Sequence, residues 1–409
     1  MDLLHPRCAG LDVHKDTVVA CVRLHGVPEP ERFHHTFGTT TDQLLELHDW
    51  LAQHEVTHIV MEATGVYWKP VWHVLEEQFE LTLANAAHVK NVPGRKTDVN
   101  DSTWLADLHA HGLVAASFVP PKPIQALRAL TRTRKQLVRE RARHTQRIDK
   151  VLEEANIRLS SVITDRNGKS GRALIKALAN GETNTEELLE LLHGRLKTKR
   201  SQVRKALRGN LKEHHRLLLR VHVTQLEALE QSLEALTQEL GGLLEPFRES
   251  VELLKTIPGF GDTTAEIVMA EIGADMSRFP NAAALRSWSG LCPGQNMSAG
   301  KRKSSKTRKG SKWLKTAMVQ AAKSAARTKG SVFREKYLRL KSRIGTQKAT
   351  VALAANLITV AYAVLRDRRP YTCQAVQDLE AQVTRKQARH LAKRLEQLGF
   401  EVQLQPKAA

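Results

Sequence analysis

Gly10-Leu11-Asp12-Val13, which continues through Thr17-Val18-Val19-Ala20-Cys21-Val22, is an apolar stretch with a carboxylate inside it. A second apolar run, His58-Ile59-Val60-Met61, ends in Glu62. β-Strands disfavour such residues, and a buried unpaired charge costs on the order of several kcal/mol. A divalent cation would neutralise both, because oxygen ligands suit Mg²⁺ or Mn²⁺. Two such ions roughly 4 Å apart can hold the attacking and leaving oxygens of a phosphodiester, so the pattern raises the hypothesis of a protein that cuts nucleic acid.

A further acidic pair, Asp98 and Asp101, stands three residues apart near a predicted helix start. This spacing places both side chains on one side of a helix, although acids are common in the first turn of any helix because they complement its dipole. An aspartate on the first strand, an acid ending a later strand and a helical acidic pair together are typical of an RNase H-like nuclease core. Asp16 and Asp107 are the acidic alternatives.

The charge of the chain points to a phosphate polymer as partner. The 409 residues carry a formal net charge of +20 and have a sequence pI of about 10.0. A cationic surface gains affinity for nucleic acid by releasing counterions, whereas a basic protein without such a partner is the less informative alternative. The length predicts two or three domains.

The four cysteines have neither zinc-site spacing nor the pattern of a disulfide framework, and the N-terminal segment lacks the apolar core of a signal peptide. The longest apolar stretch, 350–365, contains Asn356 and is shorter than the about 20 residues of a spanning helix, so we expect a buried helix. These features predict a cytoplasmic protein without a membrane partner.

The N-terminal part, 1–120, has an α/β pattern. We expect hairpin strands at 10–22 and about 31–38, further strands at 56–62 and 81–84, and helices at 42–53, 66–79 and from a capping Thr97 to about 111. Strands that alternate with helices predict a sheet packed by helices.

The remainder is predicted to be helical. Pro120 and Pro123 mark a boundary, after which a basic helix and a second helix at about 211–244 follow. The second helix carries leucines at heptad spacing, so 121–250 is expected to be a coiled-coil region or part of a bundle, with a loop-rich insertion at 160–210. The segment 251–370 forms a third, mostly helical block, and 371–409 a helical tail.

Two parts of the helical region are candidates for nucleic-acid contacts. The first long helix presents Arg128, Arg132, Arg139 and Arg143, which we expect to contact RNA phosphates. Thr256-Ile257-Pro258-Gly259-Phe260-Gly261 resembles the hairpin of a helix-hairpin-helix element, in which Gly259 and Gly261 let backbone N–H groups approach a phosphate. A plain helix–helix turn is the alternative.

The segment from Gly290 to Arg302 is predicted to be a loop by its Gly, Pro and Asn residues. It contains Ser298, a candidate nucleophile, and continues into Lys301, Arg302 and Lys303, which could hold a phosphate under attack. Chemistry alone leaves other serines in competition with it: Ser304, Ser305 and Ser311.

Several motifs together resemble those of a known family, the DEDD transposases of bacterial insertion sequences, which are bridge-RNA-guided recombinases with a RuvC-like N-terminal domain. The motifs are Gly10-Leu11-Asp12-Val13-His14-Lys15, Met61-Glu62-Ala63-Thr64-Gly65, Arg95-Lys96-Thr97-Asp98-Val99-Asn100-Asp101, Ile257-Pro258-Gly259-Phe260-Gly261, and Gly290-Leu291-Cys292-Pro293 through Gly300. Their order and approximate spacing match along about 8–370.

The resemblance implies a fold of α/β plus α, with an RNase H-like (RuvC-like) domain, a helical coiled-coil region that supports dimerisation, and a mostly helical transposase domain. It implies that Asp12, Glu62, Asp98 and Asp101 bind Mg²⁺ and that Ser298, five residues after the motif proline, is the nucleophile. It further implies a tetramer of two dimers with active sites shared between subunits, a structured guide (bridge) RNA, and target and donor double-stranded DNA.

The chain departs from the family in Ala299, where relatives commonly have glycine, which keeps Ser304 and Ser305 as alternatives. The segments 160–210 and beyond about 370 are long for the family. Two rival functions remain at this point. One is a Holliday-junction resolvase-like nuclease that uses metal-activated water, and the other is a non-catalytic nucleic-acid-binding protein.

Overall fold

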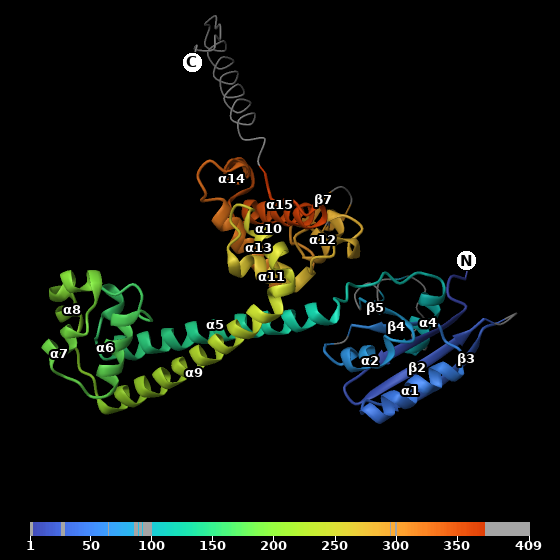
Figure 1. Cartoon of the computed structure of the whole chain (residues 1–409), viewed down its shortest axis with the longest axis horizontal. Coiled ribbons are helices and arrows are strands. Elements are labelled where there is room, and N and C mark those ends of the chain that lie inside the picture. Colours follow the sequence, from blue (N-terminus) through green and yellow to red (C-terminus); the bar gives the residue numbers. More distant parts are fainter. Residues whose placement is uncertain are drawn as a thin grey trace, which may run out of the picture. The chain divides into compact units, whose positions relative to one another are not determined.

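The computed structural model describes residues 3–25, 29–63, 65–85, 89, 92, 100–294, 296–298 and 301–372. The chain divides into two compact units, 1–119 and 120–409 (Figure 1). The first unit is a mixed α/β sheet with helices, and the second is mostly helical, which confirms the predicted α/β plus α composition in its coarse form. The predicted tail 371–409 lies almost entirely outside the described residues, as do Asp98 and the predicted cap Thr97.

The first unit is built on a five-stranded sheet with the order β3-β2-β1-β4-β5. Its strands are β1 (Arg7–Val13), β2 (Thr17–Leu24), β3 (Glu31–Gly38), β4 (His58–Glu62) and β5 (Glu80–Ala84). The first three are antiparallel neighbours, whereas β4 runs parallel to both β1 and β5. Because β1, β4 and β5 are parallel, their carboxyl ends lie at the same edge of the sheet.

Helices cover both faces of this sheet (Figure 1). On one face, α1 (Thr41–Gln53) and α2 (Trp68–Leu75) pack on a core that includes Ala9, Leu11 and Val13 of β1. On the other face lies α4 (Asp101–Ala110), which contacts β1, β2 and β4. Side chains alternate between the faces of a strand, so Cys8, Gly10 and Asp12 point toward α4.

The segment 10–22, predicted as one strand of a hairpin with 31–38, is two strands. The chain reverses direction at His14-Lys15-Asp16, where the His14 N–H donates to the Thr17 carbonyl at 2.9 Å. Three consecutive polar residues mark this turn in the sequence, and the prediction of one strand passed over them because both arms of the hairpin are apolar. The helix predicted at 42–53 and the strands at 56–62 and 81–84 are present with bounds shifted by up to two residues.

Two long helices pair in the second unit. They are α5 (Lys122–Glu154) and α9 (Glu213–Leu244), and their contacts run antiparallel: Ile148 and Leu152 cluster with Leu219 and Leu226. At the other end, Ile124 and Leu127 cluster with Leu240. The heptad leucines predicted as a seam on the second helix therefore face α5 within the same chain.

The insertion at 160–210 joins these two helices and is made of short elements. They are η1 (Leu159–Ser161), α6 (Lys169–Ala179), α7 (Thr185–Glu190), η2 (Gly194–Lys199) and α8 (Arg200–Ala206). Leu174, Ile175 and Leu178 of α6 are buried in the same core as Ile148 and Leu219. The insertion is thus folded onto the end of the helical pair.

A compact group of helices follows η3 (Glu245–Phe247). It contains α10 (Arg248–Lys255), α11 (Asp262–Ile272), η4 (Met276–Arg278), α12 (Ala282–Trp288), α13 (Lys312–Ala325), α14 (Val332–Ile344) and α15 (Thr346–Asp367), with the strands β6 (Asn296–Ser298) and β7 (Lys301–Ser304) between α12 and α13. Among the described residues, α15 is the one helix long and apolar enough to cross a membrane. It packs against α10, α12, α13 and α14 and buries Leu353, Leu357 and Ile358, as predicted for a core helix.

Candidate functional site

Asp12 and Glu62 lie next to each other at the carboxyl edge of the sheet. The register of the parallel strands β1 and β4 pairs Leu11 with Met61, so the next residue of each strand is one of the two acids. The preceding strand residues Leu11 and Met61 are fully buried, whereas the Asp12 side chain is about 20% exposed. Solvent or a ligand can therefore reach the carboxylate at the end of a buried strand.

The start of α4 brings Asp101 to the same edge. The Cys8 thiol donates to the Ala106 carbonyl at 3.6 Å, and a Cβ on Gly10 would lie 2.1 Å from the Ser102 carbonyl oxygen. α4 therefore runs antiparallel to β1, so the end of β1 at Asp12 lies near the first turn of α4. Asp101 is in that turn, directly after the N-cap Asn100. Glycine at position 10 lets helix and strand approach this closely.

A histidine that the sequence analysis did not single out belongs to this edge. His14 lies in the β1–β2 turn, and its Nε2 is 3.1 Å from a carboxylate oxygen of Asp12. The signal for it was its place two residues after Asp12, just beyond the strand end. The pair shows that a nitrogen ligand or donor stands beside the acids.

Of the two acidic alternatives, Asp107 is engaged elsewhere. Its carboxylate accepts from Arg23 Nε at 2.9 Å and from Arg32 Nη2 at 3.1 Å, which ties α4 to the antiparallel strands β2 and β3. Asp16 is exposed in the β1–β2 turn. The contacts of Asp107 are those of a structural ion pair.

The acids at the sheet edge have the oxygen chemistry that Mg²⁺ or Mn²⁺ prefers, and Asp12 is accessible. Among the described residues, however, Asp12, Glu62 and Asp101 do not form a group whose ligand atoms all lie within 4.8 Å of one another. Asp98 lies outside the described residues. Asp12, Glu62 and Asp101 therefore lie at the same edge of the sheet without forming a complete ligand set, and the four-acid metal site stays a prediction.

Within the described part of the chain, one set of side chains does meet that distance: Glu154, His214 and His215. His215 is buried, and its Nδ1 accepts the Lys212 N–H at 3.1 Å as part of a helix cap. A neutral ring that accepts at Nδ1 carries its proton on Nε2, which faces Glu154 at 3.9 Å. This tautomer offers no lone pair to an ion, so the hydrogen bonding of His215 favours a helix cap over a metal ligand.

Ser298 lies in a β-hairpin, although the sequence predicted a loop. Ser298 in β6 pairs with Lys301 in β7, and the strands extend through a bridge between Pro293 and Thr307. Gly294 N donates to the Lys306 carbonyl at 2.9 Å, which continues the ladder toward the hairpin base. The paired residues are 3 to 14 positions apart in the sequence. Their cross-strand hydrogen bonds hold this segment in a β-hairpin, although its Gly, Pro and Asn content is typical of a loop.

The hairpin places Ser298 on an exposed, basic arm. Ser298, Lys301 and Lys303 are all exposed. The chain of Arg302 is in β7, but its side chain lies outside the described residues. At the base, a Cβ on Gly310 would lie 2.4 Å from Gly290 N, so the two ends of the arm touch through their glycines.

The competing serines differ in what they already bind. Ser311 caps α13 by accepting from Leu314 N at 3.2 Å and donates to a carboxylate oxygen of Glu271 at 2.9 Å. Ser304 accepts from Lys306 N at 3.1 Å, and Ser305 is exposed in the basic segment. The contacts of Ser311 are those of a structural hydroxyl.

Glu271 in α11 is a buried carboxylate that ties α5 to the base of the serine hairpin. It has no exposed surface, and its two oxygens accept from Arg132 Nε and Nη2 at 2.7 and 2.9 Å. Arg128 donates to the Glu271 backbone carbonyl; burial lowers the pKa of this arginine to about 10, and the nearby carboxylate opposes that shift. Two of the four arginines predicted to contact RNA are thus engaged by Glu271 and partly buried, whereas Arg139 and Arg143 are exposed.

The predicted helix-hairpin-helix element is α10, a turn and α11. Gly259 has φ 93°, and a Cβ there would lie 2.6 Å from the Ala321 carbonyl oxygen of α13. Close packing on α13 is therefore a sufficient reason for this glycine. Gly261 is the N-cap of α11, and a Cβ there would meet nothing within 4 Å, so the phosphate contact at this helix start stays a prediction.

Comparisons with known proteins match both units. Residues 9–157 match the DEDD transposase family of the IS110 type, and residues 251–338 match the family described as transposase IS116/IS110/IS902. Pilin gene-inverting proteins of Moraxella lacunata and Moraxella bovis are 25% and 24% identical over 375 residues, covering 88% of this chain and 96% of each relative. A protein described as a candidate mini-circle transposase for IS117 of Streptomyces coelicolor is 26% identical over 226 residues, covering 49% of this chain and 54% of that one.

Proposed function

Because the chain belongs to the transposase family of IS110-type insertion sequences, and so is a DNA-processing enzyme, we propose that it recombines DNA under the guidance of a structured RNA, with Ser298 as its nucleophile. The observation that carries the proposal is the placement of Asp12 and Glu62 at adjoining ends of parallel strands, beside the first turn of α4. Sheet edges of this kind gather ligands from several elements at one point.

The acids Asp12, Glu62, Asp98 and Asp101 are proposed to hold Mg²⁺ or Mn²⁺. A bound ion would polarise the scissile phosphate and stabilise the charge that develops on it. The order β3-β2-β1-β4-β5, with β2 antiparallel to β1 and the acids on β1, β4 and α4, fits an RNase H-like (RuvC-like) core. His14 is proposed to orient the carboxylate of Asp12, since the two are in contact.

Ser298 is proposed to attack phosphorus with its Oγ. One P–O bond forms to the serine as the bond to a strand oxygen breaks, the hydroxyl proton passes to water, and the departing strand takes up a proton. A phosphodiester to the protein preserves the energy for rejoining when a strand hydroxyl reverses the attack. The exposed Lys301 and Lys303 stand on the same hairpin to hold the phosphate.

Guide RNA, target DNA and donor DNA are the proposed partners, and the bacterial cytoplasm is the proposed compartment. The net charge of +20 supports a polyanionic partner, and base pairing by an RNA would select the DNA while the protein contacts backbone and shape. Arg139 and Arg143 are the exposed pair of the four proposed RNA contacts. A tetramer in which acids and serine come from different subunits completes the proposal.

The test is to trap a covalent protein–DNA adduct. Labelled donor and target DNA are incubated with the protein, its co-purified RNA and Mg²⁺, and resolved under denaturing conditions. Ser298→Ala is expected to abolish the adduct while RNA binding persists, and Ser305→Ala is the matched control that keeps it. An adduct that survives Ser298→Ala refutes the assignment, and hydrolysed ends without any adduct favour a nuclease that activates water.

A further inference from the structure

A groove lies in the second unit where α5 and α13 pack over α11, and both cationic and apolar side chains line it. Thr131, Arg132, Lys135 and Arg139 line it from α5; Lys135 lies three and four residues from Arg132 and Arg139, which places these three cations on one side of that helix. From α13 come Trp313, Thr316, Ala317 and Gln320, and from α11 Ile267 and Glu271. Three long cationic side chains and an indole ring thus line the same groove.

The cations are arranged around the ring of Trp313. The guanidinium carbons of Arg132 and Arg139 lie 5.7 and 5.6 Å from the ring centroid, and Lys312 Nζ lies 5.2 Å from it. Arg132 is fixed by its two bonds to Glu271, so one side of the ring has a rigid partner. Arg139 is exposed and can move away from the indole to meet a ligand.

The positive charges of the groove exceed the negative charges that line it. The carboxylate of Glu271 already pairs with Arg132 and accepts a hydrogen bond from Ser311. Across the described parts of the chain, neither Lys135 nor Arg139 forms an ion pair with a carboxylate. A groove with two uncompensated cations and an aromatic wall fits a ligand that carries an anion next to a flat π-surface.

We propose that this groove binds one nucleotide of a single-stranded nucleic-acid segment, with its base stacked at Trp313 and its phosphate held by Lys135 and Arg139. A duplex keeps its bases paired and stacked, so it could supply the phosphate alone, whereas a single strand exposes a base face as well. The proposal rests on the proposed action on guide RNA and DNA, and it adds a site for an unpaired segment of either strand type.

Binding of labelled single strands tests the groove. Oligo(dT) and oligo(rU) of about 12 nucleotides, and a duplex of about 20 bp, are titrated against the full chain with fluorescence anisotropy as the readout. Trp313→Leu is expected to weaken single-strand binding about tenfold and duplex binding less than about twofold, because stacking is lost and charge is kept. Trp313→Phe, which retains an aromatic ring, is expected to restore most of the loss. The tighter-binding single strand identifies the source of the nucleotide.

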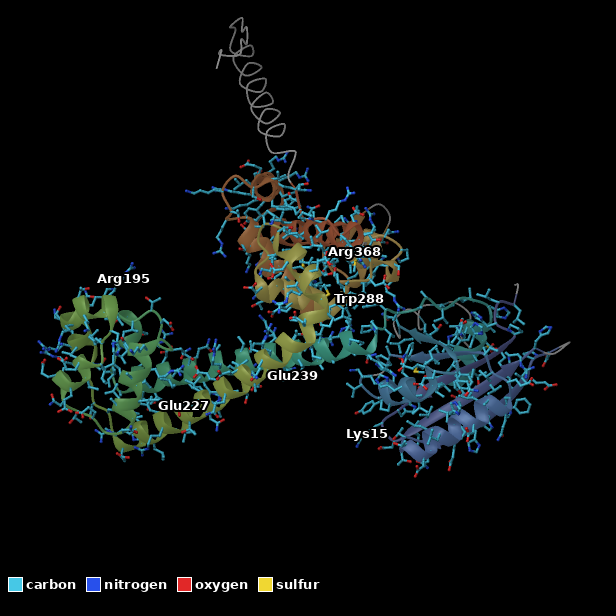
Figure 2. The ribbon with its side chains drawn as sticks, viewed as in Figure 1. Lys15, Arg195, Glu227, Glu239, Trp288 and Arg368 are labelled. Carbon is cyan, nitrogen blue, oxygen red and sulfur yellow. The ribbon has the colours of Figure 1, made fainter. Side chains whose placement is uncertain are left out.

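Two control variants separate the groove from general effects. Trp288 (labelled in Figure 2) is a second tryptophan under an arginine, with Arg128 at 5.7 Å, and lies outside the groove, so Trp288→Leu is expected to leave single-strand binding unchanged. Lys135→Gln is expected to weaken binding and lower the salt slope by about one, whereas Lys150→Gln, an exposed lysine on the same helix, changes the slope less.

The proposal is overturned if Trp313→Leu weakens duplex and single strands equally, or weakens neither, or if Trp313→Phe fails to restore binding while the chain remains folded. If Lys135→Gln and Lys150→Gln change the salt slope of binding equally, the proposal is also overturned, because the positive charge would then act at any position on the helix and not in the groove. The adduct assay at Ser298 is independent: its failure refutes the proposed chemistry and leaves the Trp313-dependent binding to stand or fall by itself.

Discussion

Gly10 of β1 and Ser102 of α4 are packed so tightly that a Cβ on Gly10 would lie 2.1 Å from the Ser102 carbonyl oxygen. The same Cβ would lie 2.6 Å from Ala106 N, so backbone atoms on two successive helix turns obstruct it. Both obstacles are main chain, so a side-chain rotation cannot relieve them. This contact fixes how far the first turn of α4, with Asp101, stands from Asp12.

Gly10→Ala is therefore expected to push α4 off the sheet. We expect a loss of about 3 kcal/mol in the free energy of unfolding, with loss of DNA cleavage, because overpacking at backbone atoms forces the helix to shift. Urea unfolding measures the first effect. Gly241→Ala on α9, where nothing lies within 4 Å, is the matched control and is expected to raise stability by about 0.5–1 kcal/mol. A Gly10→Ala protein as stable as the wild type would contradict the contact.

Glu271→Gln is expected to destabilise the second unit by about 3 kcal/mol, because it removes a buried carboxylate that accepts from Arg132 and Ser311 and leaves the Arg132 guanidinium, about a third exposed, without a counter-charge. Glu266, on the same helix, pairs with Arg134 but is about a fifth exposed, so Glu266→Gln is expected to cost about 1 kcal/mol or less. Urea unfolding of the two variants gives the comparison. Equal losses in the free energy of unfolding would show that the burial of Glu271 does not make its ion pair more stabilising than that of Glu266.

Asp12→Asn and Ser298→Ala are each expected to abolish adduct formation alone. If acids and serine act across subunits, a mixture of the two inactive proteins, dissociated and reassembled, forms mixed oligomers in which one site has both groups. About a quarter or more of the wild-type adduct signal is then expected to return at equal ratios, by random assortment of subunits. The adduct gel measures it, and the doubly substituted Asp12→Asn/Ser298→Ala protein mixed with wild type is the control. No recovery would place acid and serine in one subunit.

His109 is expected to make the first unit sensitive to acid. Burial, with His5 and His58 adding repulsion, lowers the pKa of His109 to about 4 from its ordinary value of 6.5. The rings of His5 and His109 are stacked at 4.6 Å. The folded state thus favours the neutral ring, so its stabilising contribution is complete above about pH 6.5 and is lost as the pH falls toward 4.

From these values, the free energy of unfolding is expected to fall by about 2 kcal/mol between pH 7.5 and pH 5 on account of His109. His109→Leu, which keeps the site apolar and filled, is expected to remove most of this dependence. Urea unfolding at the two pH values measures it. His48→Leu, at a partly exposed helix position, is the control variant, and a pH dependence unchanged by His109→Leu would show that another group is responsible.

The local elements could be predicted because their signals are local. The apolar run within 56–62, the helical spacing of 42–53 and the heptads of 211–244 each need only neighbouring residues. The turn inside 10–22 was missed although His14, Lys15 and Asp16 interrupt the apolar run there, because that run was treated as one strand across the three polar residues. Ser298 was predicted to lie in a loop because the prediction used the composition of the segment around it. That composition does not show that the segment pairs with the following strand.

By itself, the sequence determined the α/β plus α composition, the basic charge and the family, because residue type, spacing and motif order carry all three. Only the tertiary structure decided that Glu271 holds Arg132, its partner 139 positions away, and that Gly10 sets the distance between α4 and the sheet. The physical reason is that burial and ion pairing depend on which surfaces meet after folding. A charged side chain that looks free in the sequence can therefore be neutralised by a partner that no local pattern reveals.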